Sequence, residues 1–126
     1  MSDKKKILAV DDEVQMTKML KRNLDVTGKF EVRTENEGLK ALAAAKEFRP
    51  DLILLDVMMP DADGGDVAAQ ILADPDLKGT PIIFLPAIVE KQEVEGSAGS
   101  IGGHPFLAKP IKTEDLIAAI EENLRG

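Results

Sequence analysis

The stretch DLILLDVMMP, residues 51–60, decides the fold because it joins a short apolar run to an acid and a proline. Four apolar residues, Leu52 to Leu55, lead directly into Asp56. A run of this length, bounded by a charge and a proline, is typical of a strand that is buried on both faces. The carboxyl end of such a strand lies at the edge of a parallel sheet where open α/β folds bind their ligands. Asp56 is therefore predicted to lie at the reactive edge of the molecule.

The composition is that of one globular domain, because 44% of the 126 residues are hydrophobic and 31% are charged. The chain has no cysteine, which excludes disulfides and thiolate sites. The net charge is −7 and the basic residues are scattered, so we expect no direct binding of nucleic acid. No apolar stretch is long enough to span a membrane and no signal peptide is visible, so we expect a cytoplasmic protein without membrane contact.

Five short runs are predicted to be strands, namely residues 6–10, 30–34, 52–55, 81–85 and 106–108. A helical pattern follows each run. Strands that alternate with helices imply a parallel sheet with right-handed crossovers and helices on both faces. We therefore predict an α/β fold with a doubly wound five-stranded parallel sheet. It is of the flavodoxin-like (βα)5 type, with strand order 2-1-3-4-5.

Capping residues indicate where the helices begin. Asn36 is predicted to cap a helix that runs to Lys46, and Asp63 and Thr113 to cap the helices after the third and fifth strands. The inner face of the helix after Asn36 is predicted to hold Leu39, Leu42 and Ala43. Residues 90–105 hold four glycines, and each interior glycine costs a helix about 1 kcal/mol relative to alanine. A short or disordered fourth helix is expected there.

Three of the predicted strand ends carry charged residues. Asp11 and Asp12 follow the first strand, Asp56 follows the third and Lys109 follows the fifth. The first and third strands are neighbours at the point where the strand order of such a sheet reverses. Carboxylates brought this close resist ionisation unless a cation joins them, and Mg²⁺ suits a site with few protein ligands. A carboxylate beside Mg²⁺ and a lysine can attack a phosphoryl group and form an acyl phosphate.

Three motifs together resemble the receiver domain of two-component response regulators (CheY-like) over essentially the whole chain. They are Asp11-Asp12, Asp56 to Pro60 with Gly64, and Lys109-Pro110. Each motif alone is weak evidence for the family, but the three motifs at these separations are specific to it. The resemblance implies a single receiver domain over residues 1–126 that is a signalling protein and not an enzyme. It also implies that the Lys109–Pro110 peptide bond is cis, which is inexpensive only before proline.

The resemblance further implies a role for each site residue and for the partners. Asp56 accepts a phosphoryl group from a histidine kinase or phosphotransfer protein, and Lys109 contacts that group. Mg²⁺ is bound by Asp12, Asp56 and the backbone carbonyl of Met58, with Asp11 contributing through water. The phosphorylated domain signals to a downstream protein through the face of the fourth helix, fifth strand and fifth helix.

Two positions depart from the family pattern. Pro86 stands where the family carries Ser or Thr, and it has neither a hydroxyl nor a backbone N–H. Phe106 holds the aromatic switch position without a tyrosine hydroxyl. We therefore predict that Asp56 is phosphorylated but that the phosphate is coupled more weakly to the output face. The resemblance implies that Met58 and Ile88 flank the attacking water, and because both side chains are apolar and cannot orient it, slow self-dephosphorylation is predicted.

Other interpretations stay open at this point. Asp11 or Asp12 alone could cap the first helix, and Lys109 alone could be a surface lysine. The main alternative function is a pseudo-receiver, a constitutive protein-interaction module without productive phosphorylation, which Pro86 and the glycine-rich segment favour. A phosphohydrolase is disfavoured because the DxD motif is absent, and a nucleotide-binding enzyme because the glycine-rich phosphate-binding motifs are absent.

Overall fold

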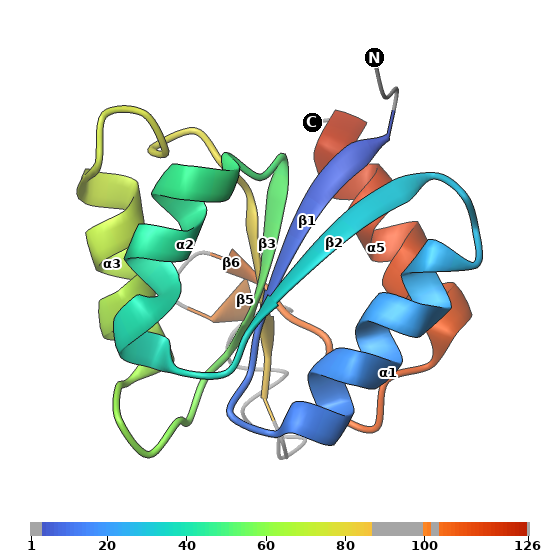
Figure 1. Cartoon of the computed structure of the whole chain (residues 1–126), viewed down its shortest axis with the longest axis horizontal. Helices are drawn as coiled ribbons and strands as arrows, with labels where there is room; N and C mark the ends of the chain where they lie inside the picture. Colours follow the sequence, from blue (N-terminus) through green and yellow to red (C-terminus); the bar gives the residue numbers. More distant parts are fainter. Residues whose placement is uncertain (1–3, 87–99, 102–103, 126) are drawn as a thin grey trace.

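The computed structural model describes residues 4–86, 100–101 and 104–125 as a sheet between two layers of helices (Figure 1). The strands of the main sheet are β1 (Lys5–Val10), β2 (Phe30–Glu35), β3 (Leu52–Asp56) and β4 (Ile82–Leu85). The helical elements are α1 (Val14–Asp25), the 3₁₀ turn η1 (Gly38–Lys40), α2 (Ala41–Phe48), α3 (Gly64–Ala73) and α5 (Thr113–Arg125). Within the described ranges, no helix has the length and apolar character needed to cross a membrane.

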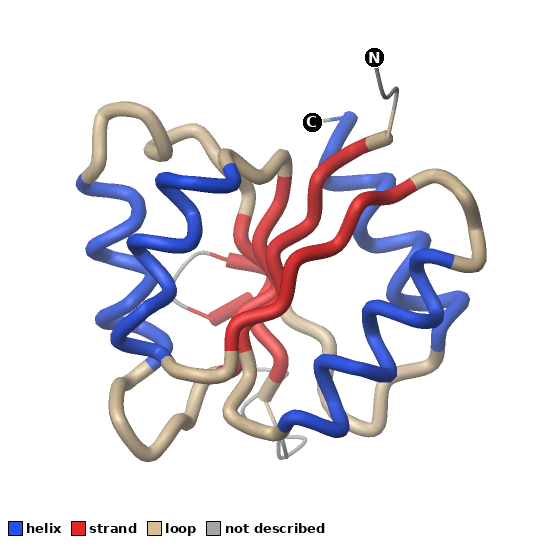
Figure 2. The backbone as a smooth tube through the Cα atoms, in the orientation of Figure 1, coloured by secondary structure: helices blue, strands red, loops and turns tan. Residues whose placement is uncertain are grey.

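The main sheet is parallel throughout and has the strand order β2-β1-β3-β4. Figure 2 shows α2 and α3 against one face of the sheet and α1 and α5 against the other. All five residues of β3 are buried. Ile53 and Leu55 pack in the core beneath α2 and α3, whereas Leu52 and Leu54 pack in the core beneath α1 and α5. The predicted doubly wound α/β fold is confirmed.

The predicted fifth strand is reduced to a single parallel bridge between Phe106 and Phe84. The Leu107 N–H donates to the Phe84 carbonyl at 2.9 Å, and the Lys109 N–H donates to the Pro86 carbonyl at 2.9 Å. The segment therefore runs beside β4, which agrees with the predicted order 2-1-3-4-5. Another bridge would need an N–H at residue 86, and proline has none. Pro86 thus ends the ladder that β4 begins.

The prediction for the fourth helix lies mostly outside the described residues. Of residues 90–105, the structure describes only 100–101 and 104–105. These form β5 (Ser100–Ile101) and β6 (His104–Pro105), which pair antiparallel as a second small sheet. The His104 ring meets the Phe84 ring edge-on at a centroid distance of 5.4 Å.

The prediction that Asn36 caps the second helix is wrong. The segment enters η1 at Gly38, and α2 begins only at Ala41. The N–H groups of Gly38 and Leu39 donate to the carboxylate of Asp61, at 3.2 and 3.0 Å. The Asp61 carboxylate therefore caps this helical segment, because it accepts hydrogen bonds from N–H groups of the first turn that have no partner within the helix.

The inner face predicted for this helix is right at Leu42, which is partly buried against the core, but it is wrong at Leu39 and Ala43, which are exposed. Leu39 is 75% exposed, and Ala41, Ala44 and Ala45 are the buried residues of α2. A 3₁₀ turn has 3.0 residues per turn and an α-helix has 3.6. The short turn at η1 therefore shifts the face that the following helix presents to the core.

Candidate functional site

The carboxyl ends of β1 and β3 bring two acids side by side. Val10 pairs with Leu55 in the parallel ladder, so the next residues along the two strands are Asp11 and Asp56. Asp11 is 0% exposed and Asp56 is 3% exposed. Asp12 is partly exposed and lies next to them. Carboxylate oxygens of the three acids lie within 4.8 Å of one another.

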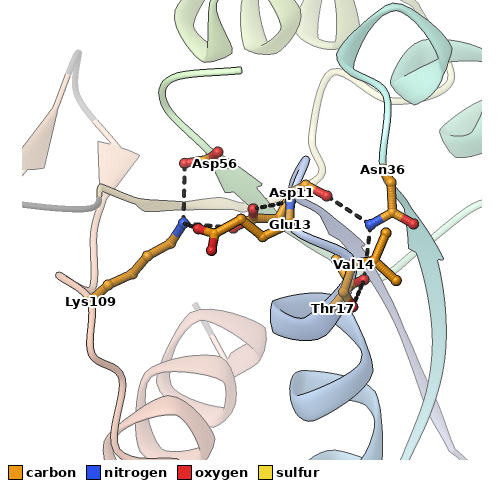
Figure 3. A network of polar contacts seen from close by, with 7 residues as sticks. All are labelled: Asp11, Glu13, Val14, Thr17, Asn36, Asp56 and Lys109. Carbon is orange, nitrogen blue, oxygen red and sulfur yellow. Dashed lines mark hydrogen bonds and ion pairs between the residues drawn. The ribbon is translucent and has the colours of Figure 1, made fainter. Parts of the chain in front are cut away.

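Lys109 reaches this cluster from the segment that precedes α5 (Figure 3). Its Nζ lies 2.7 Å from Asp11 Oδ2, 3.5 Å from Asp56 Oδ1 and 3.5 Å from Glu13 Oε1. The lysine side chain is only 13% exposed. A buried ion pair of this kind is costly to break, because each partner is left as an uncompensated charge.

The cluster perturbs the ionisation of both Asp56 and Lys109. Burial, the charge of Asp11 and the hydrogen bond and charge of Asp12 raise the pKa of Asp56 to about 6, against the lowering effect of Lys109. Burial lowers the pKa of Lys109, but the hydrogen bond and charge of Asp11 and the charges of Asp56 and Glu13 outweigh it. The pKa of Lys109 therefore lies above its usual value.

The donor set fits a hard divalent cation. It consists of three carboxylates, one of them partly exposed, and Mg²⁺ is bound in proteins by one or two carboxylates together with waters. Asp11 Oδ1 accepts from the Glu13 N–H at 2.9 Å. Asp11 Oδ2 is buried, and Lys109 Nζ lies 2.7 Å from it as its charge partner. A second cation at this edge would relieve the excess of negative charge.

Tight packing fixes the start of α3 against the end of β3. The Gly64 N–H donates to the Val57 carbonyl at 2.8 Å. A Cβ at Gly64 would overlap the Asp56 carbonyl oxygen, so only glycine allows this approach. The Asp63 side chain accepts from the Gly65 N–H at 2.7 Å, which confirms the predicted cap of α3.

The remaining site residues of the sequence prediction lie around the cluster. Met58 forms an isolated bridge with Asp63 in the loop after β3, and its side chain is 82% exposed. Pro86 is buried at the end of β4, and Phe106 is half-buried against the core beneath α2 and α3. The Lys109–Pro110 peptide bond is cis. Ile88 lies outside the described residues.

Two features of the site were not predicted from the sequence. Glu13 contributes a further charge to Lys109, although its place beside the Asp11-Asp12 pair gave a signal for this. Asn36 donates to the Asp11 carbonyl at 2.8 Å and to the Thr17 hydroxyl at 2.9 Å. No local pattern in the sequence indicates these contacts, because they join residues that are 19 and 25 positions apart.

A family model for the response regulator receiver domain matches residues 7–121. The chain belongs to this family. It is 36% identical over 122 residues to the DNA-binding response regulator MtrA of Mycolicibacterium paratuberculosis, covering 97% of this chain and 52% of MtrA. It is also 36% identical to a protein-glutamate methylesterase/protein-glutamine glutaminase of Rhodospirillum rubrum, covering 94% of this chain and 32% of that enzyme. The receiver domain thus spans about half or less of the length of these relatives.

Solved receiver-domain structures share the whole fold. The chemotaxis protein CheY4 of Vibrio cholerae superposes with a TM-score of 0.80 at 32% identity, covering 94% of this chain and 98% of that one. The signal receiver domain of a histidine kinase from Syntrophus aciditrophicus gives a TM-score of 0.81 at 31% identity, covering 97% and 91%. Receiver domains are signalling domains of two-component systems. One relative is named as DNA-binding, so the predicted absence of nucleic-acid binding stays a prediction for this chain.

Proposed function

We propose that this receiver domain, a single domain over residues 1–126, accepts a phosphoryl group on Asp56. The donor is the phosphohistidine of a histidine kinase or phosphotransfer protein. Mg²⁺ is held by Asp12, Asp56 and the backbone carbonyl of Met58, with Asp11 contributing through water. The observation that supports this proposal is the convergence of three carboxylates and Lys109 on one buried edge of the sheet.

In the proposed reaction an Asp56 carboxylate oxygen attacks the phosphorus. The bond from phosphorus to the donor imidazole nitrogen breaks, and the nitrogen keeps the electron pair. When bound, Mg²⁺ supplies positive charge that offsets the charge on the transferring oxygens. Lys109 Nζ lies 3.5 Å from Asp56 Oδ1 and can therefore pair with a phosphoryl oxygen attached to that carboxylate. Asp56 must be ionised to attack, and a pKa of about 6 leaves it mostly ionised at neutral pH.

The phosphodonor must cover this edge of the sheet for its imidazole to reach Asp56. A groove of about 440 Å³ opens beside Lys109 and is lined by Glu13, Met16, Met19, Lys109, Pro110 and Ile111. Its apolar floor comes from α1 and from the loop before α5. We propose that an apolar surface of the donor protein binds in this groove, because the groove adjoins the edge of the sheet that carries Asp56.

The output is proposed to pass to a downstream protein through the face formed by the segment at Phe106, α5 and the predicted fourth helix, which falls mostly outside the described residues. The hydroxyl that the family carries at position 86 is missing here, and Pro86 is buried. Coupling between the phosphate and Phe106 is therefore proposed to be weaker than in the family. A cytoplasmic location is part of the same proposal, because the phosphodonor is a cytoplasmic kinase or phosphotransfer protein.

Incubation with acetyl phosphate and Mg²⁺ tests the proposal, with intact mass and amide NMR shifts as the measurements. The wild type is expected to gain one phosphoryl group, and Asp56→Asn none. An unmodified wild type that matches Asp56→Asn would favour the pseudo-receiver instead. Modification without shifts at Phe106 would show that the phosphoryl chemistry is retained and that the switch is lost.

A further inference from the structure

The side-chain amide of Asn36 ties the end of β2 to the turn that carries the acids (Figure 3). Its Nδ2 donates to the Asp11 main-chain carbonyl at 2.8 Å and to the Thr17 hydroxyl at 2.9 Å. Thr17 is 1% exposed, and its hydroxyl donates to the Val14 carbonyl at 3.1 Å. Both N–H donors of the amide thus have acceptors. The orientation of the Asn36 amide follows from this contact. The Asp11 carbonyl oxygen can only accept a hydrogen bond, so the NH₂ group of the amide must face it.

This contact acts on the peptide unit between Asp11 and Asp12. The unit is planar, so fixing its carbonyl oxygen also fixes the direction in which the chain leaves toward Asp12. The last backbone bond of the β1–β2 pair runs from the Asp11 N–H to the Glu35 carbonyl, at 3.1 Å. Just beyond that bond, Asn36 holds the Asp11 carbonyl. Asn36, the residue that follows β2, therefore contacts the backbone directly between the two acids.

Asn36 has no competing role in its own segment. The N–H groups at the start of η1 are taken by Asp61, so the Asn36 side chain does not serve as a helix cap. Within the acid turn, the Glu13 N–H already holds Asp11 Oδ1. Asn36 thus holds the Asp11 carbonyl, and the Glu13 N–H holds Asp11 Oδ1. The other carboxylate oxygen, Asp11 Oδ2, faces Lys109 and the proposed cation site.

We propose that Asn36, supported by Thr17, is a positioning residue that holds Asp11 and Asp12 in the arrangement that binds the divalent cation. This inference rests on the proposed function, because it assigns the acid cluster to Mg²⁺. Asn36 contacts the backbone of the acid turn and is not one of the proposed ligands of the cation. It acts on the ligands from outside, and partners of this kind change metal affinity by about 10- to 100-fold when they are removed.

The test is the Mg²⁺ affinity of Asn36→Ala, measured by calorimetry and by amide shift titration without any phosphodonor. Affinity is expected to fall about tenfold. In the metal-free protein the Glu13 amide is expected to exchange faster with solvent, because the turn is less constrained. The matched control is Asn123→Ala, which loses an equivalent 2.8 Å bond from an asparagine amide to the Ala119 carbonyl on α5. Its Mg²⁺ affinity is expected to equal that of the wild type.

Thr17 provides a second arm of the test that does not depend on the folding of Asn36→Ala. Thr17→Val removes the hydroxyl and keeps the shape, so affinity is expected to fall several-fold. Thr17→Ser keeps the hydroxyl, and affinity is expected to recover. In the double variant of Asn36→Ala and Thr17→Val the two losses are expected to be less than additive, because both remove one network.

Several outcomes would overturn the inference. The inference fails if Asn36→Ala is folded and its Mg²⁺ affinity is within twofold of the wild-type affinity. Equal losses in Asn123→Ala, or in Thr17→Ser and Thr17→Val, would show a general effect on stability instead. Failure of the proposed function gives a different result. There the wild type binds Mg²⁺ and responds to Asn36→Ala as expected, but Asp56 never takes up phosphate.

Discussion

Replacing Asp56 by asparagine is expected to stabilise the metal-free protein at neutral pH. Asp56 is 3% exposed and shares its surroundings with Asp11 and Asp12, so its negative charge is unfavourable in the folded state. Burial and these neighbours raise the pKa of Asp56 to about 6. An acid whose pKa is higher in the folded state than in the unfolded state destabilises the fold once the unfolded state has ionised. This cost is absent below the unfolded pKa and is complete above the folded pKa.

The size of the effect follows from the shift. The change from 3.8 to about 6 is about two units, and each unit corresponds to ~1.36 kcal/mol, which gives ~3 kcal/mol at pH 7.5. The same linkage relation leaves less than ~1 kcal/mol at pH 4. The favourable interaction with Lys109 is already contained in this shift, and we expect a measured gain of about 1–3 kcal/mol at pH 7.5. For a domain of this size that corresponds to about 3–5 °C in Tm per kcal/mol.

The assay is urea unfolding of the wild type and Asp56→Asn in EDTA, at intervals from pH 4 to pH 7.5. The gain from asparagine is expected to grow across this range and to level off above pH 6. Asp76→Asn removes an exposed carboxylate, and its effect is expected to stay within ~0.5 kcal/mol at every pH. Mg²⁺ is expected to reverse the order at pH 7.5, since it stabilises the ionised wild type preferentially. A variant that is less stable than the wild type in EDTA at pH 7.5, or a pH-independent difference, would refute the reasoning.

Three further predictions concern the surroundings of this carboxylate. Lys109→Met is expected to cost the metal-free fold about 2–4 kcal/mol, since Asp11 is left as a buried unpaired charge, and millimolar Mg²⁺ is expected to restore part of this in thermal melts. Gly64→Ala is expected to cost about 1–3 kcal/mol in urea unfolding because its Cβ meets the Asp56 carbonyl. Gly79→Ala meets no atom within 4 Å and serves as the control, so equal losses would contradict the packing argument. The aspartyl phosphate is expected to decay over minutes or longer, faster in Met58→Asn, and a wild-type half-life of seconds would contradict the predicted slow hydrolysis.

The sequence predicted well that Asp11 and Asp56 meet at one edge of the sheet, because parallel strands bring their carboxyl ends to one place. Asp11 and Asp56 end apolar runs, and the β1–β3 register then makes them neighbours. The cap at Asp63 was predictable too, since it acts on the Gly65 N–H only two residues away. Features that depend on strand order or on local spacing are encoded in short stretches of sequence.

The segment after β2 was predicted less well because its structure depends on distant residues. Asn36 has the chemistry of a helix cap, but its amide is used by Asp11 and Thr17. The cap comes from Asp61, 22 residues beyond Leu39. Residues that a short-range pattern assigns to a helix end can instead join two loops of the site. Asn36 is such a residue, and its contacts with Asp11 and Thr17 are those on which the proposed positioning role rests.

Pro86 affects both the sheet and the proposed switch through one chemical property. It has no N–H, so the ladder between β4 and the Phe106 segment stops after one bridge. It has no hydroxyl either, so position 86 offers no donor to a phosphoryl group on Asp56. Its carbonyl still accepts from the Lys109 N–H at 2.9 Å. The lysine that is proposed to contact the phosphoryl group is therefore still held to β4, and any remaining coupling to the output face is expected to run through Lys109.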